Sequence, residues 1–130
     1  WISFVLQTPT MRIYIGGDSG YDKHFAEIGK TFGPFDLAII ENGQYNKNWK
    51  HVHLLPEEIV QVANDLSAKR LFTVHSSKFA LGNHAWNDPL IRAFENTQKA
   101  NIPLITPKIG EVVLLKDITQ QFDQWWKGIN

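Results

Sequence analysis

The order of apolar and polar residues divides the chain into two regions. Near the start, short alternating runs at residues 2–6 and 12–15 predict two strands, and the Thr-Pro-Thr turn between them favours an antiparallel pair. Glycines at 16–20 break the second strand, and the apolar spacing that follows predicts a helix over residues 21–30. The first region is therefore predicted to be a hairpin followed by a helix.

Later in the chain, short apolar runs alternate with helical patterns. The runs at residues 36–40 and 71–74 are continuously apolar, as expected for strands that are covered on both faces. Two further strands are predicted at 102–105 and 112–115. Because these strands alternate with helices, the pattern indicates parallel strands joined by right-handed crossovers, and the predicted fold class is α/β.

Three more helices are predicted between these strands and at the end of the chain. Pro56 is predicted to be the first residue of a helix over 56–69, because proline suits that position. Asp88 is expected to cap a helix over 88–100, since an aspartate side chain accepts hydrogen bonds from the first free N–H groups. An amphipathic pattern over 118–126 predicts a terminal helix.

Composition narrows the class of protein. With 130 residues, 43% of them apolar, the chain can form a single domain with a real core. The 13 basic and 13 acidic residues balance, which argues against nucleic-acid binding through phosphate contacts. Cysteine is absent, so a metal site would use histidines and carboxylates.

No apolar run approaches the roughly 20 residues of a membrane-spanning helix. The start at Trp1, inside a strand pattern, suggests a piece of a longer protein.

Candidate chemistry lies just after the predicted strands. Asp18 and His75 each follow a strand, and in parallel α/β sheets such positions form the binding site. A carboxylate and an imidazole there could share a metal ion that accepts oxygen and nitrogen ligands. Each also has a structural explanation, because aspartate is common in glycine-rich turns and a histidine can be buried and hydrogen-bonded. His51 and His53 form an H-x-H pair that could chelate, but their loop is expected to face solvent.

Five stretches of sequence, taken together, resemble a known family. They are Ile-Tyr-Ile-Gly-Gly-Asp-Ser-Gly-Tyr at 13–21, His-Phe-Ala-Glu-Ile-Gly at 24–29, Phe-Gly-Pro-Phe-Asp-Leu-Ala at 32–38, His-Leu-Leu-Pro-Glu-Glu at 53–58 and Val-His-Ser-Ser-Lys-Phe-Ala-Leu at 74–81. In this order they are similar to the metallo-β-lactamase-fold hydrolases, in particular to the branch of N-acyl-phosphatidylethanolamine phospholipase D and its bacterial relatives. The resemblance extends over about residues 2–115.

The resemblance implies a fold and a metal centre. The expected fold is the C-terminal half of a four-layer αβ/βα metallo-β-lactamase sandwich, with a mixed sheet and flanking helices. Two divalent ions, expected to be zinc with manganese or iron as alternatives, would lie at the sheet edge. Asp18 matches the carboxylate that bridges both ions, and His75 matches a histidine ligand of the second ion. His53 matches a histidine that lines the active site without being a primary ligand.

Three features depart from the family pattern. The H-x-H-x-D-H motif has no counterpart in this sequence and is expected upstream of Trp1. Glu41-Asn42 replaces an apolar Pro-Ile pair, and Ser76-Ser77-Lys78 replaces Trp-Gly-Thr. Both replacements border the expected substrate cleft, which weakens the case for an N-acyl phospholipid as the substrate.

The resemblance predicts a metal-dependent hydrolase of the phosphodiesterase kind, in which a hydroxide bridging two metal ions attacks phosphorus. The expected residues are Asp18 and His53 in catalysis, Asp18 and His75 as metal ligands, and Lys78 and Tyr45 at the substrate. A small-molecule or lipid phosphodiester would be the substrate. The complete protein is expected to be cytoplasmic, with a peripheral membrane association as a further option.

Two other functions remain open at this point. A sugar-phosphate lactonase has the same fold and ligand set. A non-catalytic α/β module that pairs with another chain is the alternative outside enzymes. Alone, the chain is expected to be inactive, and its uncovered sheet face is expected to pair with an N-terminal half or with a copy of itself.

Overall fold

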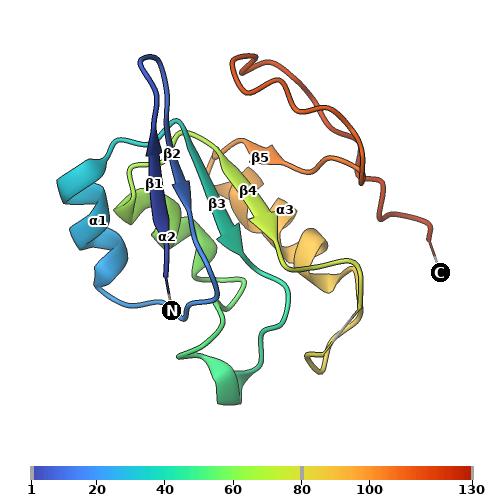
Figure 1. Cartoon of the computed structure of the whole chain (residues 1–130). Coiled ribbons are helices and arrows are strands. Elements are labelled where there is room, and N and C mark those ends of the chain that lie inside the picture. Colours follow the sequence, from blue (N-terminus) through green and yellow to red (C-terminus); the bar gives the residue numbers. More distant parts are fainter. Residues whose placement is uncertain (1, 80, 130) are drawn as a thin grey trace.

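Five strands form one mixed sheet in the computed structural model, which describes residues 2–79 and 81–129. The strands are β1 (Phe4–Gln7), β2 (Arg12–Ile15), β3 (Leu37–Glu41), β4 (Leu71–Val74) and β5 (Leu104–Ile105). They lie in the order β1-β2-β3-β4-β5, with β1 antiparallel to β2 and the other neighbours parallel (Figure 1). The predicted hairpin and the α/β class are both confirmed.

Three α-helices pack against one face of this sheet (Figure 1). They are α1 (His24–Phe32), α2 (Ile59–Asp65) and α3 (Asp88–Lys99), and a short 3-10 helix, η1 (Lys47–Trp49), lies in the loop after β3. Each parallel strand pair is joined through one α-helix, because a parallel connection must cross from one end of the sheet to the other. Within the described ranges, no helix has the length and apolar character needed to cross a membrane.

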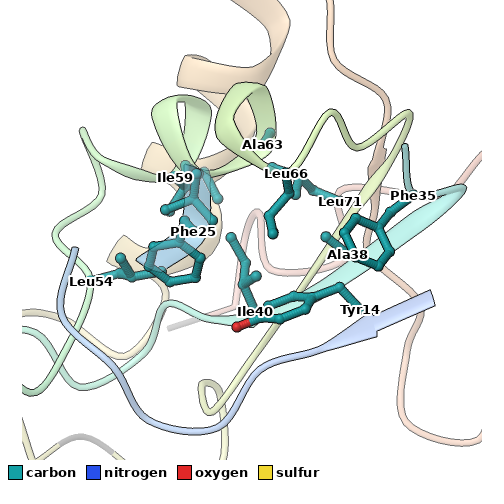
Figure 2. Packing of buried hydrophobic residues seen from close by; sticks show 12 residues of the cluster. Tyr14, Phe25, Phe35, Ala38, Ile40, Leu54, Ile59, Ala63, Leu66 and Leu71 are labelled. Atoms are coloured by element: carbon teal, nitrogen blue, oxygen red, sulfur yellow. The ribbon is translucent and has the colours of Figure 1, made fainter. Parts of the chain in front are cut away.

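The main core lies between the sheet and the helices. Alternate strand residues contribute to it, among them Tyr14, Ala38 and Ile40, because successive side chains of a strand face opposite sides. Phe25 of α1 and Ile59 of α2 pack against them (Figure 2). The rings of Tyr14 and Phe25 meet edge to face, with centroids 6.2 Å apart. This packing fixes the position of the strands whose ends carry the candidate functional residues.

The opposite face of the sheet carries a smaller apolar cluster. Ile13 and Leu37 are buried there, and Phe122 from the C-terminal segment packs against this cluster. Phe4 of β1 pairs with Ile15 and so lies on the same face, where it is 57% exposed. The C-terminal segment therefore covers part of this face and leaves β1 open.

Helix α2 is shorter than the sequence predicts. It covers Ile59–Asp65, whereas the apolar pattern predicts a helix over 56–69. Pro56 is not its first residue, because the preceding segment forms turns. The carboxylate of Glu58 accepts a hydrogen bond from the Leu55 N–H at 2.8 Å, which closes a separate turn before the helix.

The starts of the other helices also differ from the prediction. Helix α1 begins at His24 instead of residue 21. Asp88 is not the cap of α3 but its first helical residue, and Asn87 occupies the cap position. The side chain of Asn87 makes no capping hydrogen bond. The Asp88-Pro89 pair therefore predicts where α3 starts, but not which residue occupies the cap position.

Two predictions for the C-terminal region are wrong. Residues 112–115 form no strand, and residues 118–126 form no helix. The side chain of Gln120 accepts a hydrogen bond from the Leu114 N–H and donates one to the Val112 carbonyl, both at 2.8 Å. These side-chain contacts satisfy backbone groups that a strand or a helix would otherwise pair.

Candidate metal centre

The neighbouring parallel strands β2, β3 and β4 end at the same edge of the sheet (Figure 1). Asp18 follows β2, His75 directly follows β4, and His53 lies in the loop after β3. One potential ligand atom from each of these side chains lies within 4.8 Å of the other two. The structure thus brings together the three residues to which the sequence and the family resemblance assign the chemistry.

Asp18 sits in a glycine-rich turn that packs against the next loop. The Gly16 N–H donates to a carbonyl of β3 at 2.8 Å, so the turn begins directly at the sheet edge. A β-carbon on Gly20 would lie only 2.1 Å from the carbonyl oxygen of Lys50, in the loop that leads to His53. The two loops therefore pack directly against each other at Gly20. The Asp18 side chain stays 41% exposed, which leaves its carboxylate open to a ligand.

His75 has a left-handed backbone conformation, with φ at 69°. Non-glycine residues adopt this conformation rarely, and such strain concentrates at functional sites. The buried Gln44 supports the turn, because its side-chain amide donates to the carbonyls of His75 and Phe79 at 3.3 and 3.0 Å. Nε2 of His75 lies 3.8 Å from Oδ1 of Asp18. The turn therefore directs the His75 imidazole toward the Asp18 carboxylate.

His53 does not face solvent, in contrast to the prediction from its loop position. Its side chain is only 12% exposed. Its ring stacks on His75, with centroids 5.6 Å apart and planes at 25°, and meets Trp49 edge to face. The His53 N–H donates to the Trp49 carbonyl at 2.9 Å and closes the turn after η1. Burial of the ring could not be read from the sequence, because it depends on this turn.

The electrostatics keep His53 neutral. Burial lowers the pKa of His53 below its ordinary value, and the nearby His75 acts in the same direction, while Asp18 opposes both. An imidazole that is neutral near pH 7 can bind a metal ion or accept a proton.

The donor set fits a divalent cation. A carboxylate oxygen and two imidazole nitrogens are ligands that zinc accepts, and manganese and iron also use them. Catalytic zinc sites commonly have three protein ligands, and here three donor atoms lie within 4.8 Å of one another. We call Asp18, His53 and His75 the metal cluster.

The sequence places Glu41 at the border of the expected substrate cleft but does not reveal its contact with His53. Glu41 ends β3 and is 2% exposed. Its Oε1 accepts a hydrogen bond from the Leu54 N–H at 2.6 Å and lies 3.4 Å from Nδ1 of His53. Burial raises the pKa of Glu41 to about 8, although the N–H groups of Leu54 and Gly43 act in the opposite direction. The available signal was a charged residue directly after an apolar strand.

The two expected substrate contacts lie outside the metal cluster. Lys78 is exposed in the loop that begins at His75. Tyr45 is buried, its hydroxyl donates to the carboxylate of Asp88, and its ring stacks on His84 with centroids 4.2 Å apart. Tyr45 lines a cavity of about 730 Å³ to which no residue of the metal cluster contributes. Its hydroxyl is therefore already paired within the protein.

Known proteins match this chain over most of its length. The β-lactamase superfamily domain matches residues 1–76. Outer membrane protein RomA of Klebsiella pneumoniae is 50% identical over 78 residues, which make up 60% of this chain and 59% of that protein. An uncharacterized protein of Mycobacterium tuberculosis is 34% identical across 98% of this chain and 35% of its own length.

A phospholipase and a solved structure extend these matches. N-acyl-phosphatidylethanolamine-hydrolyzing phospholipase D 1 of Caenorhabditis elegans is 34% identical over 63% of this chain and 24% of that protein. Igni18, a metallo hydrolase from Ignicoccus hospitalis, has a TM-score of 0.64 at 18% identity, with 84% of this chain and 43% of that one covered. The chain spans less than two thirds of the length of these relatives. By the domain match over residues 1–76, with which the phospholipase and the metallo hydrolase fold agree, the chain belongs to the metallo-β-lactamase-fold hydrolases.

Proposed function

We propose that this chain forms part of a metal-dependent phosphodiesterase, with Asp18 and His75 as metal ligands and His53 as a catalytic histidine. The observation that carries the proposal is the convergence of these three side chains, whose donor atoms lie within 4.8 Å of one another. The similarity to a phospholipase D supports a phosphodiester as the bond that is cleaved.

In this proposal, Asp18 and His75 would bind the divalent ion that supplies the positive charge of the site. A bound divalent ion would supply a Lewis acid that polarises a phosphoryl oxygen and lowers the pKa of a water molecule. The Asp18 carboxylate offers two oxygens and can contact more than one ion. His75 presents Nε2 on the other side, 3.8 Å from Oδ1 of Asp18. Together these two residues would determine the position of the metal ion relative to the substrate phosphate.

His53 moves the proton in this proposal. Because burial lowers its pKa, the ring is neutral at neutral pH and can accept the proton that the attacking water releases. The water oxygen forms a bond to phosphorus, the ester P–O bond breaks, and His53 returns the proton to the departing alcohol oxygen. Lys78, exposed in the adjacent loop, would meet a substrate phosphate as a point charge.

We propose that the remaining ligands come from a segment outside these 130 residues. The support is that the relatives are longer than the region they share with this chain. The reading frame upstream of Trp1 should then encode an H-x-H-x-D-H motif. An upstream frame without the motif would contradict this part of the proposal.

The activity test uses the protein that includes this upstream segment, loaded with zinc. Bis(p-nitrophenyl) phosphate serves as the phosphodiester and a sugar-phosphate lactone as the competing substrate. We expect hydrolysis of the phosphodiester and a loss of roughly 10²-fold or more in Asp18→Asn. Hydrolysis of the lactone alone would assign a lactonase. Absence of both activities in the zinc-loaded protein would favour a non-catalytic module.

A further inference from the structure

Glu41 is a buried carboxylate to which the proposed function assigns no task. It is 2% exposed, and its Oε2 has no hydrogen-bond partner among the described residues. Burying such a group costs free energy, since a carboxylate in an apolar environment loses its hydration. The cost would be avoided by an apolar residue, which β3 has at each of its other positions. Packing alone therefore does not explain why a carboxylate occupies this position.

The one carboxylate oxygen of Glu41 that has partners faces the His53 loop. Oε1 accepts the hydrogen bond of the Leu54 N–H at 2.6 Å and lies 3.4 Å from Nδ1 of His53. This Nδ1 is buried and makes no hydrogen bond to a residue in the ranges 2–79 and 81–129, so Oε1 of Glu41, 3.4 Å away, is the acceptor toward which a proton on Nδ1 would point. Because Oε1 accepts the Leu54 N–H, it acts as an acceptor, and the proton of the pair belongs on Nδ1. This holds whether or not Glu41 is charged, since a proton on Glu41 would reside on Oε2.

A proton on Nδ1 leaves a lone pair on Nε2, because a neutral imidazole carries only one N–H. Nδ1 faces Glu41, so Nε2, at the other side of the ring, is the nitrogen free for a ligand or a proton. The histidine ligands of metal sites are oriented in the same way by carboxylates that accept from their second nitrogen.

We propose that Glu41 is a positioning residue that holds His53 in the Nδ1–H tautomer and thereby leaves the Nε2 lone pair free for a ligand or a proton. Glu41 pairs with Val74 in the sheet, directly before His75. One side chain thus ties the His53 loop to the strand that delivers His75. The use of the lone pair in catalysis rests on the proposed function, whereas the tautomer itself does not.

The tautomer is measurable without metal or substrate. Long-range ¹H–¹⁵N NMR spectra of the purified 130-residue chain distinguish a protonated from an unprotonated ring nitrogen, at a pH well above about 6.5, the usual pKa of histidine. We expect Nδ1 of His53 to be protonated in the native chain and in Glu41→Gln, whose amide oxygen can accept from the same two donors. In Glu41→Leu, which has no acceptor, we expect His53 to shift toward the Nε2–H tautomer.

Two controls come from the same chain. Nδ1 of His84 lies 2.9 Å from the Ala85 carbonyl, an acceptor only, so His84 serves as an internal Nδ1–H reference in every spectrum. Glu58→Leu removes another carboxylate that accepts a backbone hydrogen bond in this loop, from Leu55, and should leave His53 unchanged.

Two results would overturn the proposal. One is an Nε2–H tautomer of His53 in the native chain, a measurement that does not depend on any variant folding. The other is a folded Glu41→Leu chain with unchanged His53 signals. Neither result bears on whether the complete protein cleaves phosphodiesters, so failure of the tautomer and failure of the proposed function are separate outcomes.

Discussion

Gly43 and His75 lie so close together that a β-carbon on Gly43 would be 1.7 Å from the His75 carbonyl oxygen. The chain leaving β3 therefore lies directly on the turn that follows β4. Only glycine permits this approach, because any side chain would occupy the space of the neighbouring backbone. This close contact connects the loop that carries His53 to His75, the proposed metal ligand.

Gly43→Ala should therefore destabilise the fold and displace His75. Overpacking of a close backbone contact costs about 1–3 kcal/mol, and occasionally more, in the free energy of unfolding. Urea unfolding followed by circular dichroism measures this loss, and the NMR signals of the His75 ring report the displacement. Unchanged stability and unchanged His75 signals in Gly43→Ala would contradict the close packing of the two loops.

The raised pKa of Glu41 predicts a pH-dependent stability in the metal-free chain. Folding raises this pKa from 4.5 to about 8, so between these values the folded state holds a proton that the unfolded state has released. Stability must then fall as pH rises through this range, by up to about 1.4 kcal/mol per pH unit for one proton. His53 acts in the opposite direction only below its usual pKa of 6.5, because its pKa is lowered.

The window from pH 6.5 to 8 suits Glu41 best, because the contribution of His53 fades as the pH rises above its usual pKa of 6.5. Urea unfolding of the native chain should show falling stability across this window, and Glu41→Gln should show a clearly smaller slope. Groups that titrate equally in both chains cancel in this comparison. Equal slopes in the two chains would argue against a proton on buried Glu41.

The open sheet face predicts self-association of the chain. Phe4 and Leu6 pair with Ile15 and Ile13, so they extend the partly covered face, and they are 57% and 49% exposed. Burying side chains of this kind stabilises by roughly 1.5–3 kcal/mol each. Sedimentation at low micromolar concentration should detect a species above the 14.9 kDa monomer, reduced in Leu6→Lys. A monodisperse monomer with cooperative unfolding would show that Phe122 and its neighbours cover the face sufficiently.

The roles of Asp18 and His53 should separate in the protein that includes the upstream segment. Asp18→Asn should lose metal together with activity, because it removes a charged ligand. His53→Ala should retain the metal but lose turnover by roughly 10²–10⁴-fold, the usual contribution of a proton-transfer group. His51→Ala, at an exposed position in the same loop, is the matched control and should behave as the native protein. Metal loss in His53→Ala would instead make His53 a ligand.

Much of the fold is predictable from the sequence, because apolar runs report buried strands directly. The runs that give β2 and β4 predict their bounds, and the family motifs predict the clustering of Asp18 and His75. The prediction for residues 118–126 is wrong because periodic apolar side chains indicate burial but not backbone hydrogen bonds, and Phe122 is packed from an irregular segment. The burial of His53 and its proximity to Glu41 depend on a contact between a loop and a strand end, which no local pattern encodes.

Localising a bound metal ion in the 130-residue chain tests the proposed metal centre most directly. With His53 in the proposed proton-transfer role, Asp18 and His75 alone do not complete a site that normally has three protein ligands, so binding should be weak. Paramagnetic Mn²⁺ followed by NMR detects weak binding at individual residues. We expect Mn²⁺ to broaden the signals around Asp18, His53 and His75 first. The broadening should disappear in Asp18→Asn and persist in Asp22→Asn, an exposed aspartate of the same loop. Broadening that centres elsewhere, or that survives in Asp18→Asn, would contradict a metal centre at this edge of the sheet.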